Sequence, residues 1–172
     1  MGVNKMRKIF CSLVLLGTMI LCNVGMVKAN SSVLNGAVEW HGHYYKVFAM
    51  PLTWKKAYEL CKKMGGHLAT AETKEENEKI KEIYLNGEDN KGWCWIGGER
   101  KGNGIWSWIT GKTMVEYFDW VNGKPRENLQ LGGPYLSMWG RYDGKWDNLG
   151  KREKKIFMCE WETAEDAHEV DW

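Results

Sequence analysis

Residues 52–69, LTWKKAYELCKKMGGHLA, carry the pattern that decides the fold. Their apolar side chains recur at helical spacing and share one face, which consists of Trp54, Ala57, Tyr58, Cys61 and Met64. Thr53 can cap the start of this helix. Gly65-Gly66 ends it, because glycine readily adopts the left-handed conformation that follows many helices. The pattern predicts an amphipathic helix over residues 52–64.

A second helix is predicted over residues 74–85. Thr73 and Glu76 form a capping box, in which each side chain satisfies a backbone N–H of the first turn. Ile80, Ile83 and Tyr84 form its inward stripe. Short strands are predicted at 38–48, 93–96, 105–109, 135–139 and 155–161. Residues 119–150 are rich in Gly, Asn and Pro with little periodicity, and a loop of that length in a compact domain is usually functional.

The composition is that of one globular domain. The chain has 172 residues, 44% hydrophobic and 27% charged, with eleven tryptophans. Residues 1–29 have a basic start, an apolar run and a Val27-Lys28-Ala29 end, which is typical of a signal peptide. An uncleaved membrane anchor is the alternative. Cleavage after Ala29 leaves 20 basic and 22 acidic residues, a formal charge of −2, which argues against nucleic acid as a partner.

Three cysteines follow the leader: Cys61, Cys94 and Cys159. Export into an oxidising environment predicts one disulfide and one spare thiol, and composition alone leaves all three pairings open. Cys94 shares a strand face with Ile96, so we expect a buried thiol there. A metal site built on the cysteines is not expected, because the chain has no CxxC pair.

Seven short motifs follow one another in an order typical of a single family. They are Trp54…Ala57…Cys61 with Gly65-Gly66-His67-Leu68-Ala69, Trp95-Ile96-Gly97-Gly98, Trp106-Ser107-Trp108, Phe118-Asp119-Trp120, Gly123-Lys124-Pro125, Gly144-Lys145-Trp146-Asp147-Asn148 and Phe157-Met158-Cys159-Glu160-Trp161. On these motifs residues 38–162 resemble a C-type lectin-like domain. The resemblance implies an α+β fold in which two helices flank two small antiparallel sheets. It also implies a long loop region that binds the ligand, chain ends that lie close together, and a disulfide between Cys61 and Cys159.

The resemblance also implies where calcium would bind. The sugar-binding members hold the ion with a Glu-Pro-Asn or Gln-Pro-Asp tripeptide, where this chain has Lys124-Pro125-Arg126. Calcium needs six to eight hard oxygen ligands, and two cations in place of two ligands would repel it. No cofactor is therefore expected. Calcium binding remains an alternative only at a shifted site, whose ligands would be Glu127, Asn128, Asp147 and Asn148.

The expected function is that of a secreted binding module for a glycan or a protein on a cell surface. Sugars stack on aromatic rings and need polar groups at the rim, so the candidate ligand-binding residues are Arg126, Glu127, Asn128, Trp139, Arg141, Asp143, Trp146, Asp147 and Asn148. An enzyme is not expected, because no set of nucleophile, base and acid stands out.

Three smaller features complete the expectations. Residues 30–37 form a polar leader, and residues 163–172 form an acidic tail that we expect to be solvated. His41 and His43 flank Gly42. On a strand they would point the same way, so a surface metal pair is one interpretation and a solvated hairpin is the other.

Overall fold

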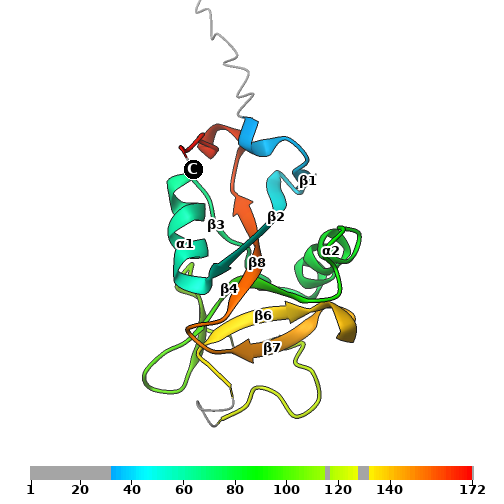
Figure 1. Cartoon of the computed structure of the whole chain (residues 1–172), viewed down its shortest axis with the longest axis vertical. Coiled ribbons are helices and arrows are strands. Elements are labelled where there is room, and N and C mark those ends of the chain that lie inside the picture. The colour runs from blue at the N-terminus through cyan, green and yellow to red at the C-terminus, as the bar shows by residue number, and fades with distance from the viewer. Residues whose placement is uncertain (1–31, 115–116, 128–131, 172) are drawn as a thin grey trace, which may run out of the picture.

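The computed structural model describes residues 32–114, 117–127 and 132–171. This part of the chain contains two α-helices and eight strands (Figure 1). Their bounds are β1 (Val38–Trp40), β2 (His43–Thr53), α1 (Trp54–Lys63), β3 (His67–Leu68), α2 (Lys74–Leu85), β4 (Trp93–Arg100), β5 (Trp106–Trp108), β6 (Tyr135–Trp139), β7 (Lys145–Leu149) and β8 (Lys154–Trp161). Single turns of 3₁₀-helix cover Ser32–Leu34, Gly140–Tyr142 and Ala164–Asp166.

The strands form one continuous sheet in the order β1-β2-β8-β4-β6-β7, with β3 paired to β8 and β5 to β4. The α+β class is confirmed, and α1 and α2 lie on either side of the central β2 and β8 (Figure 1). The expectation of two separate sheets is wrong in one respect. A parallel pairing of β4 with β8, through Cys94–Ile156 and Trp95–Phe157, joins the two halves. The other pairings are antiparallel.

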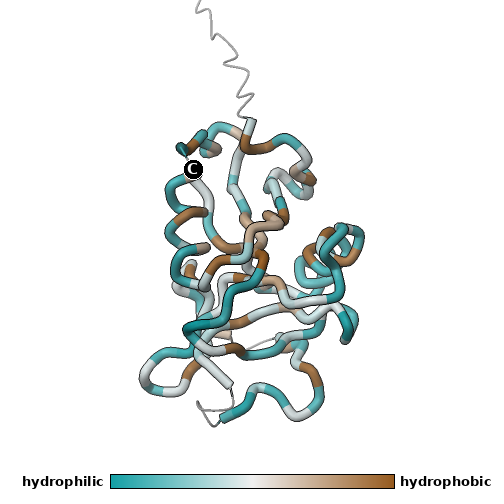
Figure 2. Tube along the Cα trace, in the orientation of Figure 1, coloured by the Kyte–Doolittle hydropathy of each residue, from teal (hydrophilic) through white to brown (hydrophobic). Residues whose placement is uncertain are grey.

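Both predicted helices form close to their predicted bounds. Thr73 accepts a hydrogen bond from the Glu76 N–H at 3.1 Å, as the capping box requires. The return bond differs, because the Glu76 carboxylate accepts from the Glu72 N–H at 2.7 Å. Thr53 precedes α1 but makes no side-chain cap. Both helices alternate between hydrophilic and hydrophobic segments along the chain (Figure 2), as expected of helices with one buried face.

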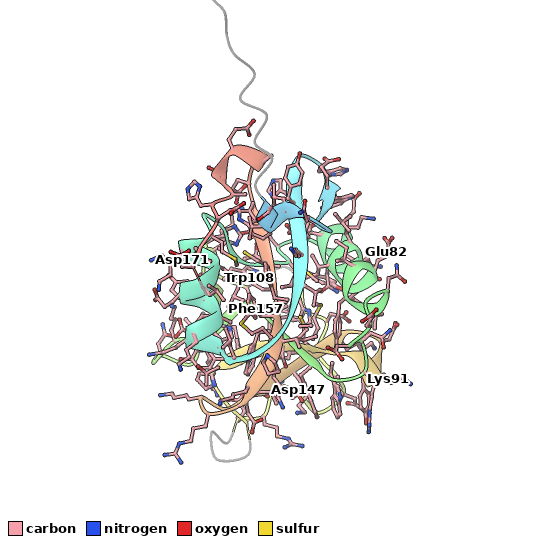
Figure 3. The ribbon with its side chains drawn as sticks, turned by 45° about the horizontal axis from the view of Figure 1, so that its top comes forward. Glu82, Lys91, Trp108, Asp147, Phe157 and Asp171 are labelled. Atoms are coloured by element: carbon pink, nitrogen blue, oxygen red, sulfur yellow. The ribbon has the colours of Figure 1, made fainter. Side chains whose placement is uncertain are left out.

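Two hydrophobic clusters lie on opposite faces of the sheet, because successive side chains of a strand point to opposite faces. Cys94 and Ile96 of β4 pack with α2 in the first cluster, whereas Trp95 packs with α1 in the second. Strand β8 alternates in the same way, and its Phe157 lies near the centre of the molecule in Figure 3. The excess of tryptophan serves mainly this packing.

The three cysteines are buried free thiols in this structure. Cys61 of α1 and Cys159 of β8 belong to the same cluster, and burial together with the neighbouring Cys61 thiol raises the pKa of the Cys159 thiol. Cys94 lies in the other cluster, fully buried as expected. A bridge between Cys61 and Cys159 therefore stays a prediction, and it would join thiols that are already neighbours.

The acidic tail is solvated over most of its described residues, but it docks on the domain at two apolar positions, which the sequence did not predict. Ala167 is buried, Val170 packs against the second cluster, and the His168 N–H donates to the Met64 carbonyl at 2.8 Å. Gly65 is needed for this docking, because a Cβ there would lie 1.6 Å from the Asp166 carbonyl oxygen. The few apolar residues of this acidic segment show no periodicity that would signal the contact.

The N-terminal segment meets the tail. Val33 is buried, and the Ser32 N–H donates to the Glu169 carboxylate at 3.1 Å, so the two ends of the described chain lie together (Figure 1). The predicted signal peptide, residues 1–29, lies outside the described residues. None of the described helices is long and apolar enough to span a bilayer.

Candidate functional site in the long loop region

The long loop region leads from β5 to β6 and packs on β7, a strand that the sequence pattern did not predict. Three consecutive residues of β7, Trp146, Asp147 and Asn148, are almost completely buried. Figure 3 places Asp147 toward the end of the molecule where the loops lie. Buried polar side chains are stable only when their hydrogen bonds are satisfied, so their partners define how the loop is held.

Asp147 forms a buried ion pair with Lys124. Its Oδ1 atom accepts from the Lys124 ammonium and from the Asn148 N–H at 2.8 Å. Its Oδ2 atom accepts from Trp93 Nε1 at 3.2 Å. The Lys124 and Asp147 side chains are only 8% and 3% exposed, so their mutual attraction is little screened by water. A lysine ammonium thus provides the positive charge at this carboxylate.

Asn148 holds the two ends of the loop together through its side-chain amide. The oxygen accepts from the Arg126 N–H at 2.7 Å, and the nitrogen donates to the carbonyls of Arg126 at 3.1 Å and Gly133 at 3.0 Å. A Cβ on Gly132 would lie 2.4 Å from this amide nitrogen. One on Gly133 would lie 1.9 Å from the Leu149 carbonyl oxygen. Positions 132 and 133 therefore have no room for an additional acidic ligand.

The shifted calcium site is not assembled by its described members. Glu127 turns to Arg100, whose Nη2 atom lies 2.5 Å from its Oε2 atom. Asp147 pairs with Lys124, and the Asn148 amide is occupied by backbone groups. Asn128 lies outside the described residues.

The aromatic candidates separate into a buried and a partly exposed residue. Trp146 is fully buried, with its Nε1 donating to Asn77 Oδ1 at 2.8 Å, so it contributes to the core rather than to a sugar platform. Trp139 is partly exposed, stacks on Trp93 at 4.8 Å and meets the tilted ring of Tyr142 at 4.2 Å. Sequence reasoning did not separate the two tryptophans by burial, because Trp139 ends a predicted strand and Trp146 lies in a stretch with little periodicity.

Arg141 and Asp143 are exposed on the turn that follows Trp139, at the hairpin between β6 and β7. The antiparallel register pairs Trp139 with Lys145, whereas Tyr135 and Leu149 pair at the other end beside the long loop. The candidate residues therefore occupy two surfaces. Arg126 and Glu127 lie at the loop end, and Trp139, Arg141 and Asp143 lie at the hairpin end.

A cleft of about 680 Å³ lies at the loop end, between the first turn of α1, the end of β4 and the loop. The charged side chains that line it are Lys55, Glu99, Arg100, Lys101, Glu127 and Lys151. Glu99 pairs with Lys101 at 2.6 Å and Glu127 with Arg100, so the exposed Lys55 and Lys151 leave the cleft with a net positive charge. Sequence reasoning missed this cleft, because it gathers residues almost 100 positions apart.

Comparisons with known proteins agree with this architecture. The family described as Lectin C-type domain matches residues 50–161. A type-2 ice-structuring protein of Brachyopsis segaliensis is 36% identical over 124 residues, 70% of this chain and 68% of that protein. One chain of a snaclec coagulation factor IX/factor X-binding protein of Echis carinatus is 32% identical over 137 residues, 74% of this chain and 98% of that one.

Among solved structures, a calcium-independent type II antifreeze protein is similar with a TM-score of 0.61 and 32% sequence identity. The match covers 73% of this chain and 90% of that one. The C-type lectin CEL-I from Cucumaria echinata has a TM-score of 0.64 at 22% identity, covering 72% of this chain and 93% of its own, which shows the shared fold. The family match spans well over half of the sequence, and this chain belongs to the C-type lectin domain family.

Proposed function

We propose that this protein is an exported, calcium-independent binding module that recognises an acidic protein surface through its long loop region. The observation that carries the proposal is the buried pair of Lys124 and Asp147. The ammonium supplies the positive charge that a bound cation would otherwise supply, and Asn148 closes the loop through backbone groups. The loop is therefore held in place by the chain's own side chains.

The charge of the cleft points to the chemistry of the ligand. Lys55 and Lys151 are exposed and lie on either side of a hollow large enough for several side chains. Complementary charge raises the rate of encounter and favours acidic partners over neutral ones. Lysine contributes a point charge on a flexible stem, which suits carboxylate groups at variable positions.

A protein surface is favoured over a glycan because the described lining offers no accessible aromatic face. Tyr135, the one described aromatic residue that lines the cleft, is buried and stacks on Trp54 at 4.4 Å. A glycan bearing acidic groups is the second candidate, supported by the same lysines.

The names of two relatives bear on the choice between a protein and another ligand. The snaclec relative is named for binding coagulation factors, which are proteins, and the other relative is named for structuring ice. An ice surface carries no net charge, so a positively charged cleft has no complement there. Thermal hysteresis above that of a non-binding protein of equal size would favour the ice-structuring function instead.

Calcium independence is tested by the melting temperature with 5 mM calcium chloride and with EDTA. The two melting temperatures should agree, because calcium stabilises the folded protein only if the folded protein binds it. The double variant Lys124→Glu with Arg126→Asn replaces the two cations by oxygen ligands and should make the melting temperature rise with calcium. A clear calcium shift in the unmodified protein would contradict the proposal.

The ligand class is tested on an array that carries acidic peptides, acidic glycans and neutral glycans, probed in EDTA. Acidic peptides should retain the protein, and Lys55→Glu with Lys151→Glu should abolish retention. Lys145→Glu is the matched control, since Lys145 is exposed at the hairpin end, away from the cleft. Retention by neutral glycans alone, or equal loss in the control, would overturn the assignment.

A further inference from the structure

A second cluster of ionisable groups lies at the far end of β8, near the chain termini. His43 of β2, Glu160 of β8 and Glu162 just after β8 each offer one ligand atom, and these atoms lie within 4.8 Å of one another. This is the one such group of three or more His, Cys, Asp and Glu residues among the described residues. The length of β8, about 20 Å at 3.3 Å per residue, separates it from the cleft.

The ligand atoms of the cluster lie close enough together to converge on one ion, since one atom from each residue falls within 4.8 Å of the others. His43 Nδ1 lies 2.9 Å from Glu160 Oε1, a hydrogen-bond distance, and His43 Nε2 lies 3.6 Å from Glu162 Oε2. Only one ring nitrogen can bind the ion, and zinc holds its ligand atoms at about 2.0–2.2 Å, roughly 3.3–3.6 Å from one another. Side-chain rotation would therefore have to replace the hydrogen bond between His43 and Glu160 by a shared ion.

Surrounding groups fix the orientation of the two carboxylates. Glu160 accepts hydrogen bonds from the Thr70 N–H at 2.9 Å and from the Tyr45 hydroxyl at 3.3 Å. Glu162 lies 3.1 Å from His67 Nε2, and the Nδ1 atom of His67 faces the Leu68 carbonyl at 2.9 Å. Outer partners of this kind orient metal ligands and sharpen affinity.

The cluster is also accessible from solvent. The Glu162 side chain is 58% exposed and that of His43 is 35% exposed, whereas Glu160 is buried beneath them. An ion can enter from the surface, and water can complete its coordination. His41, the other histidine of the hairpin, stacks on Trp40 at 4.1 Å and is not a member of this cluster. It lies in the turn before β2 with φ of 52°, so the premise that the two hairpin histidines lie on one strand is wrong.

We propose that His43, Glu160 and Glu162 bind one divalent first-row transition-metal ion, with zinc as the best match. An imidazole with two carboxylates suits zinc or manganese better than calcium, which takes oxygen ligands alone. The bound ion would add a further link between β2 and the end of β8, which already pair in the sheet. The site would thus strengthen this end of the sheet independently of the binding cleft.

Isothermal titration of the metal-free protein with zinc chloride tests the proposal, with calcium chloride as the comparison ion. One zinc ion should bind and raise the melting temperature by several degrees, and millimolar calcium should not compete. His43→Gln and Glu162→Gln should each weaken zinc binding at least about 100-fold. Both residues are partly exposed, so these variants should fold, and unfolding in EDTA checks that they do.

His41→Asn is the matched control, because it removes a histidine from the same hairpin and asparagine tolerates its left-handed backbone, with φ of 52°. This variant should bind zinc like the unmodified protein. Equal affinity in His43→Gln and His41→Asn would place the ion elsewhere and overturn the proposal, as would the absence of zinc binding. Zinc binding that calcium displaces would also overturn it, because the ligands would then be oxygen atoms alone.

Discussion

Replacing Lys124 by methionine tests how the long loop is held. The variant keeps an unbranched side chain that is one atom shorter, and it leaves the Asp147 carboxylate buried without its cation. Removing one partner of a buried ion pair typically costs about 3–5 kcal/mol. Asp147 would still accept hydrogen bonds from Trp93 and Asn148, which holds the cost near the lower limit, about 3 kcal/mol.

Urea unfolding gives the free energy of unfolding, and the melting temperature should fall by roughly 6–12 °C for a domain of this size. Lys145→Met is the matched control, because it removes an exposed lysine from β7, the strand that carries Asp147, and should change stability by less than about 0.5 kcal/mol. The double variant Lys124→Met with Asp147→Asn should be more stable than Lys124→Met alone, since no uncompensated charge is then buried. A loss below about 1 kcal/mol in Lys124→Met would refute the reasoning, and so would a double variant no more stable than the single one.

Three further predictions concern the rest of the fold. Peptide mapping without reductant should find the Cys61 peptide linked to the Cys159 peptide and Cys94 free. Reduction should lower the free energy of unfolding by roughly 4–5 kcal/mol, because the bridge closes a loop of about 100 residues. A bridge to Cys94 would contradict the pairing. Truncation after Glu162 should lower the free energy of unfolding by at least about 2 kcal/mol, because the tail packs on the second cluster; unchanged stability would contradict the docking. Burial raises the pKa of Glu76 above 4.5, so its contribution to stability is full below that pH and is lost as pH rises through the raised pKa. Glu76→Gln should therefore stabilise the protein at about pH 7 in urea unfolding and flatten the decline from about pH 4.5 upward, and a loss of stability at pH 7 would show that the charge is needed.

The sequence predicted the parts of the fold that depend on local pattern. The stripe of α1, the Thr73 cap and the alternation around Cys94 are each visible within a few residues. Strand β7 was missed because its Asp147 and Asn148 read as loop residues. They are buried because Lys124 and the loop backbone satisfy them, and partners more than 20 positions away leave no local signal.

Of the predicted site residues that the structure describes, only Glu127 lines the cleft. Residues 126–148 are neighbours along the chain, yet β6 and β7 run antiparallel, and the four steps from Tyr135 to Trp139 extend about 13 Å. This register carries Trp139, Arg141 and Asp143 away from the loop end. The turn between β7 and β8 brings Lys151 to that end, and the first turn of α1 brings Lys55. A ligand that bound at the loop end would therefore meet lysines in place of the expected tryptophans. The high tryptophan content reflects the packing of the core, and the proposed binding chemistry rests instead on the charged residues that the sheet register leaves at its edge.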